Sequence, residues 1–479
     1  MPPFLSAILT ILYVTLFVVT LLVIVSDEKG ASAKIAWIIV ISLLPAFGMI
    51  SYYLLGMNFH RGIAYQRNHK KFLEHFAADH AEELKELWDY CDNELPREYA
   101  DLARLFGKGG ACKPLSADEV TIYTEGQDKL EALLEDIKNA KKYIHMEYFY
   151  FRKGEMGNRF REALMQKARE GVKVRFIREN IANFDIPAHY YNVMRKAGVE
   201  VVRFTPVFSS LIMLPFRLNY RDHRKIAIID GEVAYSGGMN ISDDYYIRWR
   251  DTHYKVKGKL VSALQAAFLD AYITSGGKVD DTPFEELFPY LNRKEEGPVL
   301  AQAVPGDPDS RWPIISHGTE WELHNVHKYI WLQTPYFLPP ESLLHAIKTA
   351  ALKGTEVILM LPRKTDILLT TMANRAYYKE CLEAGVRIFI KDGRFIHSKT
   401  LVADDNIALI GSANLDARSL ELSYEMNTYF YDENIAAQCK AVFEKDMEEC
   451  RELTLEEWKK TSEFKKLLWN IGRLLSPIL

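Results

Sequence analysis

The sequence is poor in cysteine and lacks an excess of positive charge. Its 479 residues hold five scattered cysteines, with no CxxC or Cys/His spacing, so neither a disulfide framework nor a zinc site is indicated. We therefore predict no metal ion and no cofactor. Lys and Arg number 60 against 64 Asp and Glu, a formal net charge of −4. Because dedicated nucleic-acid binders usually carry a basic excess, we predict no nucleic-acid partner.

Charged residues are absent from two stretches near the N-terminus, Pro3 to Val25 and Ile35 to Gly56. The first stretch is long enough to cross a bilayer, and it lacks the basic start and the small-residue cleavage pattern of a signal peptide. The second contains Pro45 and Gly48, which membrane helices tolerate. A short polar turn separates the two stretches. They therefore predict a transmembrane helical hairpin over residues 1–58.

Basic residues after the second stretch indicate the orientation of this hairpin. Four of them follow closely: Arg61, Arg67, Lys70 and Lys71. The positive-inside rule places such a segment on the cytoplasmic side. We therefore expect a cell (plasma) membrane protein with two spans, whose large C-terminal part lies in the cytoplasm.

Helix-like and strand-like segments alternate in the rest of the chain. Residues 59–115 read as a charged helical linker. An amphipathic helix over Lys129–Ala140 and a strand over Tyr143–Phe151 then begin an alternation that is typical of an α/β sandwich.

The same order recurs in the second half, where Lys328-Tyr329-Ile330 resembles Lys142-Tyr143-Ile144. We predict an α/β fold with two duplicated sandwich domains, 116–290 and 291–455, related by pseudo-two-fold symmetry. An amphipathic tail follows at 456–479. It is either an interfacial helix or a helix docked on the preceding domain.

Two stretches of the sequence match in register. Each contains a histidine, a lysine two residues later and an aspartate five residues after the lysine. An asparagine follows 17 residues after each histidine, and a carboxylate follows after 28. The first set is His223, Lys225, Asp230, Asn240 and Asp251, and the second is His397, Lys399, Asp404, Asn414 and Glu425. A single pattern of this kind is usually a surface strand, but two copies in register indicate a duplicated functional unit.

These side chains suit reactions at a phosphate ester. Lysine ammonium and asparagine amide groups donate hydrogen bonds to non-bridging phosphate oxygens. One imidazole can attack phosphorus while a facing imidazole protonates the leaving oxygen. A carboxylate hydrogen-bonded to the far ring nitrogen of each histidine would fix its tautomer. Asp251 and Glu425 are the candidates for this orienting role, and Asn240 and Asn414 are candidates for binding phosphate.

The two motif aspartates admit a second interpretation. Asp230 ends a β-rich run and precedes Gly231, which is a hairpin signal, and Asp404 precedes Asp405 in the same way. Both are therefore either part of the chemistry or turn-forming residues.

The paired motifs resemble the HKD motifs of the phospholipase D superfamily. Other stretches are similar to bacterial cardiolipin synthases in particular, as are the N-terminal membrane hairpin and the ending Leu474 to Pro477. These stretches are His145 to Phe149, Asn219 to Lys225, Gly237 to Ile241, Thr334 to Phe337 and Gly411 to Leu420. One loop, Arg178 to Phe184, departs from the acidic, Gly/Ser-containing loop that we expect in the family.

The resemblance implies a phosphatidyltransferase that uses no cofactor and acts on anionic phospholipids at the membrane. One histidine attacks the phosphate of phosphatidylglycerol, and glycerol leaves. A second phosphatidylglycerol then accepts the phosphatidyl group, which gives cardiolipin. Family precedent favours His223 as nucleophile and His397 as acid and then base. The catalytic residues that it implies are His223, Lys225, Asp230, His397, Lys399 and Asp404.

Several alternatives stay open at this point. The same motifs would serve a phospholipase D hydrolase that releases phosphatidic acid, a nuclease of the superfamily, or an enzyme that uses phosphatidylethanolamine. A non-catalytic membrane scaffold is a further alternative. The apolar segment Val207 to Phe216, flanked by Arg217 and Arg221, either dips into the bilayer or packs under the first motif. The sequence does not indicate an oligomeric state.

Overall fold

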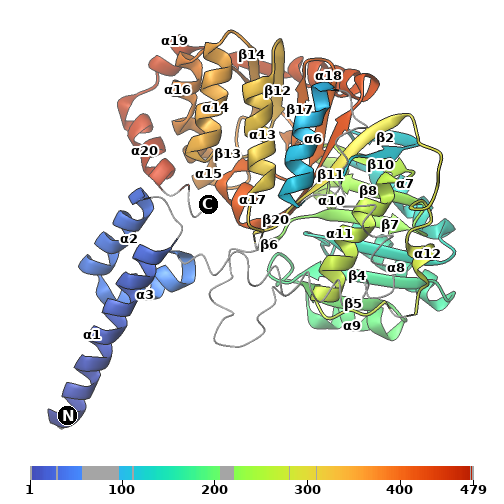
Figure 1. The fold of residues 1–479 in the computed structure, drawn as a ribbon, viewed down its shortest axis with the longest axis horizontal. Helices are drawn as coiled ribbons and strands as arrows, with labels where there is room; N and C mark the ends of the chain where they lie inside the picture. The colour runs from blue at the N-terminus through green and yellow to red at the C-terminus, as the bar shows by residue number, and fades with distance from the viewer. Residues whose placement is uncertain are drawn as a thin grey trace.

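The structure is a computed structural model that describes residues 3–27, 31–56, 97–110, 113–204, 221–279, 281–308, 310–474 and 476. Two α/β lobes make up most of it (Figure 1). The segment 207–216, which we considered as a membrane contact, lies outside the described residues.

A seven-stranded sheet forms the centre of the first lobe. Its order is β2-β10-β8-β7-β3-β4-β5. The strands are β2 (Glu119–Tyr123), β3 (Tyr143–Tyr148), β4 (Lys173–Glu179), β5 (Glu200–Phe204), β7 (Lys225–Ile229), β8 (Val233–Gly237) and β10 (His253–Lys257). The helices are α7 (Gly126–Asn139), α8 (Glu155–Arg169), α9 (Ala188–Lys196), α10 (Asp243–Ile247), α11 (Leu260–Thr274) and α12 (Phe284–Leu287).

The second lobe repeats this sheet strand for strand. The order β11-β20-β18-β17-β12-β14-β15 has the same parallel and antiparallel pairings as the first sheet, with β1 and β21 added at its two edges. The strands are β1 (Leu115–Ala117), β11 (Val299–Gly306), β12 (Tyr329–Gln333), β14 (Glu356–Pro362), β15 (Arg387–Lys391), β17 (Thr400–Ala403), β18 (Ile407–Gly411), β20 (Ser423–Tyr431) and β21 (Cys450–Leu453). The predicted pair of repeated α/β domains is therefore confirmed.

Helices of the second lobe occupy the same places as those of the first, with additions at both ends. They are α6 (Arg97–Gly109), α13 (Ile314–Asn325), α14 (Glu341–Leu352), α15 (Leu368–Ala376), α16 (Tyr378–Glu383), α17 (Ala417–Glu421), α18 (Glu433–Met447), α19 (Leu455–Lys459) and α20 (Glu463–Leu474). Helix α6 comes from the segment that we predicted as a linker, yet it packs into the core of the second lobe. The domain boundaries that we drew stay a prediction.

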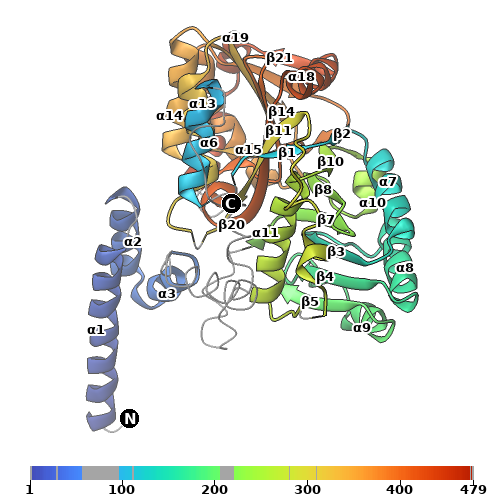
Figure 2. The ribbon, with the colours of Figure 1, turned by 45° about the vertical axis from the view of Figure 1, so that its right-hand side comes forward.

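Alternating side chains divide the molecule into five layers. Along β7, Ile226 and Ile228 point into a central core shared by both lobes, while Ala227 and Ile229 point into the outer core beneath α7, α8 and α9. A matching outer core lies between the second sheet and α6, α13 and α14 (Figure 2). The two sheets therefore face each other across the central core.

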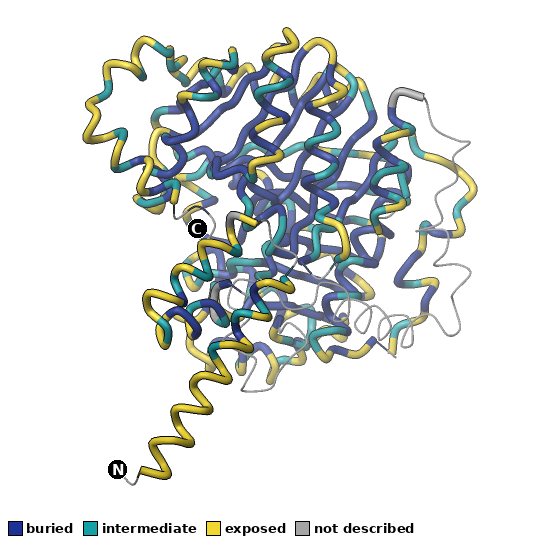
Figure 3. Tube along the Cα trace, turned by 60° about the vertical axis from the view of Figure 1, so that its left-hand side comes forward, coloured by how far each residue is buried: buried dark blue, intermediate teal, exposed yellow. Residues whose placement is uncertain are grey.

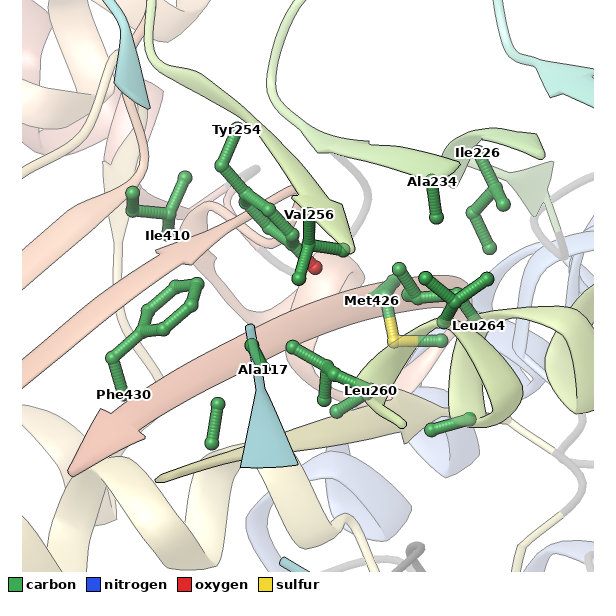
Figure 4. Close-up of a cluster of buried hydrophobic side chains, with 14 of the residues drawn as sticks. Ala117, Ile226, Ala234, Tyr254, Val256, Leu260, Leu264, Ile410, Met426 and Phe430 are labelled. Atoms are coloured by element: carbon green, nitrogen blue, oxygen red, sulfur yellow. The ribbon is translucent and has the colours of Figure 1, made fainter. Parts of the chain in front are cut away.

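The central core joins the lobes into one unit. Met426 and Phe430 of β20 pack there with Tyr254 of β10 and Leu264 of α11 (Figure 4). The Tyr254 hydroxyl lies 2.6 Å from the Thr428 hydroxyl across the interface. Because this core is continuous, the equivalent strands of the two sheets hold a fixed position relative to each other.

The N-terminal region contains one long apolar helix, α1 (Pro3–Ser26). Among the described residues it alone is both long and apolar enough to cross a membrane, and most of its side chains are exposed (Figure 3). The first predicted span therefore forms as a continuous helix.

The second predicted span does not form one straight helix. It divides into α2 (Ala31–Leu43), α3 (Pro45–Ser51) and the π-helical turn η1 (Tyr52–Gly56). Leu44 leaves the helical conformation, with φ −131° and ψ 69°, because a residue before proline is disfavoured in the helical region. At 13 residues, α2 is about 20 Å long, which is shorter than the ~30 Å hydrocarbon core of a bilayer.

The chain then returns toward α1. A Cβ on Gly48 would lie 2.8 Å from the Cα of Ile41, so glycine permits α3 to pack closely on α2. The Tyr52 hydroxyl donates to the Asp27 carboxylate at 3.1 Å, near the end of α1. The N-terminal region is therefore one long helix followed by a bent helical segment, and two complete membrane spans stay a prediction.

Candidate functional site

Strand pairs between the lobes hold the backbone of both motif histidines. The short strand β6 (Arg221–Asp222) pairs with β20 of the other lobe, and the His223 N–H donates to the Tyr424 carbonyl at 2.8 Å. In the mirror arrangement, β16 (Phe395–Ile396) pairs with β9 (Trp249–Arg250), and the His397 N–H donates to the Arg250 carbonyl at 2.7 Å. Each lobe therefore positions the histidine of the other.

The predicted orienting carboxylates also act across the lobes. Nδ1 of His223 lies 3.0 Å from both carboxylate oxygens of Glu425. Nδ1 of His397 lies 2.8 Å from Oδ2 of Asp251. Each histidine thus meets the carboxylate that follows the other histidine by 28 residues. Both carboxylates are fully buried.

Both motif lysines lie with the histidines in one largely buried cluster. Nζ of Lys225 donates to the His223 carbonyl at 2.5 Å, and Lys399 makes the same contact with the His397 carbonyl. His223, Lys225 and Lys399 are all close enough to His397 to lower its pKa. The structure therefore brings the two motifs into a single site.

Burial makes both lysines unusually acidic. It lowers the pKa of Lys225 to about 7 and that of Lys399 to about 8, although Glu425 and Asp251 oppose the shift. A bound phosphate would favour the charged ammonium forms. The site is therefore a cationic pocket whose charge depends on the anion that it binds.

The two histidines differ in their carboxylate partners. Burial alone would raise the pKa of Glu425, but His223 and Lys225 outweigh it and hold that pKa below its usual value. Burial raises the pKa of Asp251 to about 6 despite the nearby Lys399. Glu425 is therefore ionised at neutral pH, while Asp251 takes up a proton in mildly acidic conditions.

The histidines also differ in their access to solvent and in their neighbours. The side chain of His223 is 14% exposed, against 6% for His397. His223 has one ring neighbour, Phe149, at 4.8 Å, and its Nε2 atom has no hydrogen-bond partner among the described residues. His397 lies in an aromatic enclosure of Tyr245, Trp249, Tyr336 and Phe395. Burial and the adjacent Lys399 lower the pKa of His397 well below its usual value.

The two motif asparagines form hydrogen bonds with residues beside the site. Oδ1 of Asn240 accepts from the Tyr150 N–H at 3.0 Å, and its Nδ2 donates to the Tyr245 hydroxyl at 2.9 Å. Nδ2 of Asn414 donates to the Ser419 hydroxyl at 3.2 Å. Each amide nitrogen has one protein partner and a second hydrogen to donate, so phosphate binding by Asn240 and Asn414 stays a prediction.

The motif aspartates lie at the far ends of β7 and β17, about 15 Å of strand away from the lysines. The Asp230 carboxylate accepts from the backbone N–H groups of residues 141, 142 and 143 at 2.7–2.9 Å. Asp404 does the same for residues 327, 328 and 329 at 2.7–3.0 Å. Both aspartates have positive φ angles, 56° and 49°, which tight turns require. These contacts support the turn-forming interpretation, in which each aspartate ties a turn to the preceding strand, and a catalytic role for Asp230 and Asp404 stays an untested prediction.

Sequence reasoning missed three side chains that border the site. The Ser412 hydroxyl donates to Glu425 at 2.5 Å, the Tyr245 hydroxyl lies 3.1 Å from Nδ1 of His397, and the ring of Tyr336 lies 6.2 Å from the His397 ring. Ser412 was detectable, because it replaces Gly238 at the matched position of the repeat. Tyr336 lies in a stretch that resembles the family, but nothing singled out either tyrosine side chain among the 26 tyrosines of the chain.

Comparisons with known proteins agree with this site. The family described as "Cardiolipin synthase, PLD-like domain" matches residues 133–270 and 321–447, and the family described as "Phospholipase_D-nuclease N-terminal" matches residues 11–56. The first family covers both histidine motifs, and the second covers the N-terminal helices.

Curated relatives match over nearly their whole length. The major cardiolipin synthase of Bacillus subtilis is 34% identical, over 99% of this chain and 99% of that protein. A cardiolipin synthase of Listeria monocytogenes is 36% identical with the same coverage. Among solved structures, phosphatidylserine synthase of Haemophilus influenzae superposes with a TM-score of 0.60 at 16% identity, over 79% of this chain and 100% of that one, and so shares the fold. The chain belongs to the cardiolipin synthase family of phospholipase D-like phosphatidyltransferases.

Proposed function

We propose that this cardiolipin synthase transfers a phosphatidyl group from one phosphatidylglycerol molecule to another, through a phosphatidyl group bound to His223. The observation that carries the proposal is the pair of histidine–carboxylate contacts across the lobes, His223 with Glu425 and His397 with Asp251. They give one site two oriented imidazoles, which is what a two-step transfer needs.

In the first step, Nε2 of His223 attacks phosphorus, and the bond from phosphorus to the glycerol oxygen of the donor breaks. His397 gives a proton to that oxygen, so glycerol leaves as a neutral alcohol. Lys225 and Lys399 neutralise charge on the non-bridging oxygens. Glu425 accepts a hydrogen bond from Nδ1–H of His223 and stabilises the cationic ring that forms.

In the second step, the chemistry runs in reverse with a new alcohol. His397, now neutral, takes the proton from a glycerol hydroxyl of a second phosphatidylglycerol, and that oxygen attacks phosphorus. The bond from phosphorus to Nε2 of His223 breaks, and cardiolipin leaves. Because the acceptor is an alcohol and not water, the energy of the phosphodiester is retained.

The surroundings of the two histidines support His223 as the nucleophile. An ionised carboxylate at 3.0 Å raises the nucleophilicity of the opposite ring nitrogen, and that nitrogen is unobstructed among the described residues. His397 lies deeper, among aromatic rings and beside Lys399, where burial lowers its pKa. The negative charge of the bound phosphate opposes that shift and favours the protonated ring that acts as the acid.

Product analysis tests the proposed function directly. Purified full-length enzyme in vesicles of phosphatidylglycerol should yield cardiolipin and glycerol in equal amounts. Phosphatidic acid as the main product would indicate a hydrolase, and release of ethanolamine from mixed vesicles would indicate phosphatidylethanolamine as donor. No turnover of any of these lipids would indicate a membrane scaffold.

The location of the enzyme follows the same reasoning. We propose that both lobes face the cytoplasm of the cell, because Arg61, Arg67, Lys70 and Lys71 precede them. Two complete spans would place the start of α1 on the cytoplasmic side as well. The bend at Leu44 instead supports a single crossing by α1, with α2 and α3 re-entering on the side of the lobes.

An epitope tag placed before α1 distinguishes these topologies. In sealed inside-out membrane vesicles, a single crossing should protect the tag from added protease while the lobes are digested. Digestion of both the tag and the lobes would support two spans. Protection of the lobes would contradict the cytoplasmic orientation.

A further inference from the structure

The C-terminal helix α20 is apolar on two opposite faces. One face packs on α15: Trp469 and Gly472 are buried, and a Cβ on Gly472 would lie only 3.1 Å from the Ala373 nitrogen. The other face points away from the lobe. Its residues are spaced by three, four and three positions and are Phe464, Leu467, Ile471 and Leu474, with exposed fractions of 69%, 56%, 47% and 79%. Docking of the helix therefore leaves this stripe uncovered.

Two further exposed apolar residues, Ile367 and Leu368, begin the helix on which α20 docks. We call these two residues and the four-residue stripe the α20 apolar surface. It contains six of the eleven large exposed hydrophobic residues that the structure describes after residue 96. Such a concentration of apolar area marks a contact surface, because scattered exposed residues are the usual pattern.

Basic residues border this surface, although Lys459, Lys466 and Arg473 each pair with a glutamate. The segment from Trp458 to Leu474 has five basic residues, Lys459, Lys460, Lys465, Lys466 and Arg473, and one acidic residue, Glu463. Lys465 is exposed and forms no ion pair within the described part of the chain. An apolar stripe with basic flanks is complementary to a bilayer that carries anionic headgroups.

The α20 apolar surface adjoins the His397 side of the catalytic pocket. Asp366, which immediately precedes its first residue, accepts a hydrogen bond from the Tyr336 hydroxyl at 2.5 Å. The ring of Tyr336 in turn lies 6.2 Å from that of His397. In Figure 1, α20 lies at the edge of the second lobe that faces α2.

We propose that the α20 apolar surface inserts into the headgroup region of an anionic bilayer and holds the His397 side of the pocket against the lipid. The inference rests on the proposed transfer between two lipids, both of which must reach the pocket from the bilayer. Tethering by α1 alone leaves the lobes free to tilt, whereas a second contact beside the pocket fixes its entrance at the lipid surface.

A paired assay separates access to lipid from chemistry. The full-length enzyme, the double variant Leu467→Ser/Ile471→Ser and a control, Leu352→Ser, are reconstituted into phosphatidylglycerol vesicles. Leu352 is 72% exposed at the end of α14 and lies outside the surface. A parallel assay supplies short-chain phosphatidylglycerol below its critical micelle concentration. We expect the double variant to lose about tenfold in the vesicle assay and to match the wild type on the soluble lipid, while the control keeps both activities.

Equal activity of the double variant and the wild type in vesicles would overturn the proposal. An equal loss in both assays would also overturn it, because the change would then act on folding or chemistry.

Hydrogen exchange supplies a readout that does not need turnover: amides 464–474 should be protected in phosphatidylglycerol vesicles and not in phosphatidylcholine vesicles. A dimer that dissociates in detergent on this substitution would instead assign the surface to a second copy of the chain. Wild-type enzyme inactive on every lipid, with protection intact, would contradict the proposed function alone.

Discussion

The two halves of the pocket share one backbone plan and differ in the polarity around each histidine. His223 has an ionised partner, Glu425, which also receives a hydrogen bond from Ser412. His397 has Asp251, whose pKa burial raises to about 6, and an enclosure of aromatic rings. A duplicated motif therefore supplies two chemically distinct imidazoles once the residues around each histidine and its carboxylate differ. In the proposed mechanism, His223 attacks phosphorus and His397 exchanges protons.

Exchanging each carboxylate for its amide should affect the two halves unequally. We expect Glu425→Gln to lower kcat/KM by about two orders of magnitude or more at pH 6, because the imidazolium-like state of His223 loses its counter-charge. Asp251→Asn should cost less at that pH, since Asp251 is already partly neutral there. Initial rates of cardiolipin formation measure both. Equal losses would remove the difference between the halves.

A second test exchanges Gly238, which lies against Asp251, and Ser412, which donates a hydrogen bond to Glu425. A Cβ on Gly238 would lie 2.1 Å from Oδ1 of Asp251, so Gly238→Ser must displace that carboxylate. We expect roughly a tenfold or greater loss of kcat from it. The reciprocal change Ser412→Gly removes one hydrogen bond to Glu425 and should cost only several-fold. Far-ultraviolet circular dichroism serves as the folding control, and a reversed order of effects would contradict this assignment.

The pH profile reports the same groups. The kcat/KM value should fall below about pH 6, as Asp251 takes up a proton, because its raised pKa makes the carboxylate form prevail only above that value. It should also fall above about pH 7–8, as Lys225 and Lys399 lose their charge, because burial lowers the pKa of both lysines. Asp251→Asn should remove the acidic limb and keep the alkaline limb. If the acidic limb persists in this variant, a group other than Asp251 causes it.

The smallest effect on catalysis should come from the motif aspartates. Asp230→Asn keeps a residue that tolerates positive φ but weakens three hydrogen bonds to backbone N–H groups. We expect a loss of about 1–3 kcal/mol in unfolding free energy with kcat nearly unchanged. Thermal melting and steady-state rates on the same preparation check this. A large fall in kcat at unchanged stability would return Asp230 to the catalytic group.

The repeated fold and most of the paired site residues were predictable from one sequence. Because the chain is duplicated, a residue at the same spacing in both copies is a stronger candidate than a residue in one copy. Equal spacing identified His223 and His397, and it also identified Asp251 and Glu425 as their partners. Spacing did not reveal that each carboxylate meets the histidine of the other lobe. That exchange depends on the pairings of β6 with β20 and of β16 with β9, which are contacts distant in sequence.

Two other features escaped sequence reasoning for physical reasons. The break at Leu44 arises from the proline that follows it, and a hydropathy count of the run from Ile35 to Gly56 does not register it. The two apolar faces of α20 were read as a choice between docking and membrane contact. The structure shows one face docked on α15 and the other exposed, which confirms docking, while membrane contact of the exposed face stays a proposal.

Trapping of the covalent intermediate is the most direct test of whether His223 carries the phosphatidyl group. The enzyme and the variants His223→Ala and His397→Ala are incubated with phosphatidylglycerol labelled in an acyl chain, quenched, and analysed by mass spectrometry of peptides. Both variants should lose more than about a thousandfold in turnover. We expect a phosphatidyl group on His223 that accumulates in His397→Ala and is absent from His223→Ala. A phosphatidyl group on His397 that persists in His223→Ala would contradict it and exchange the roles of the two halves.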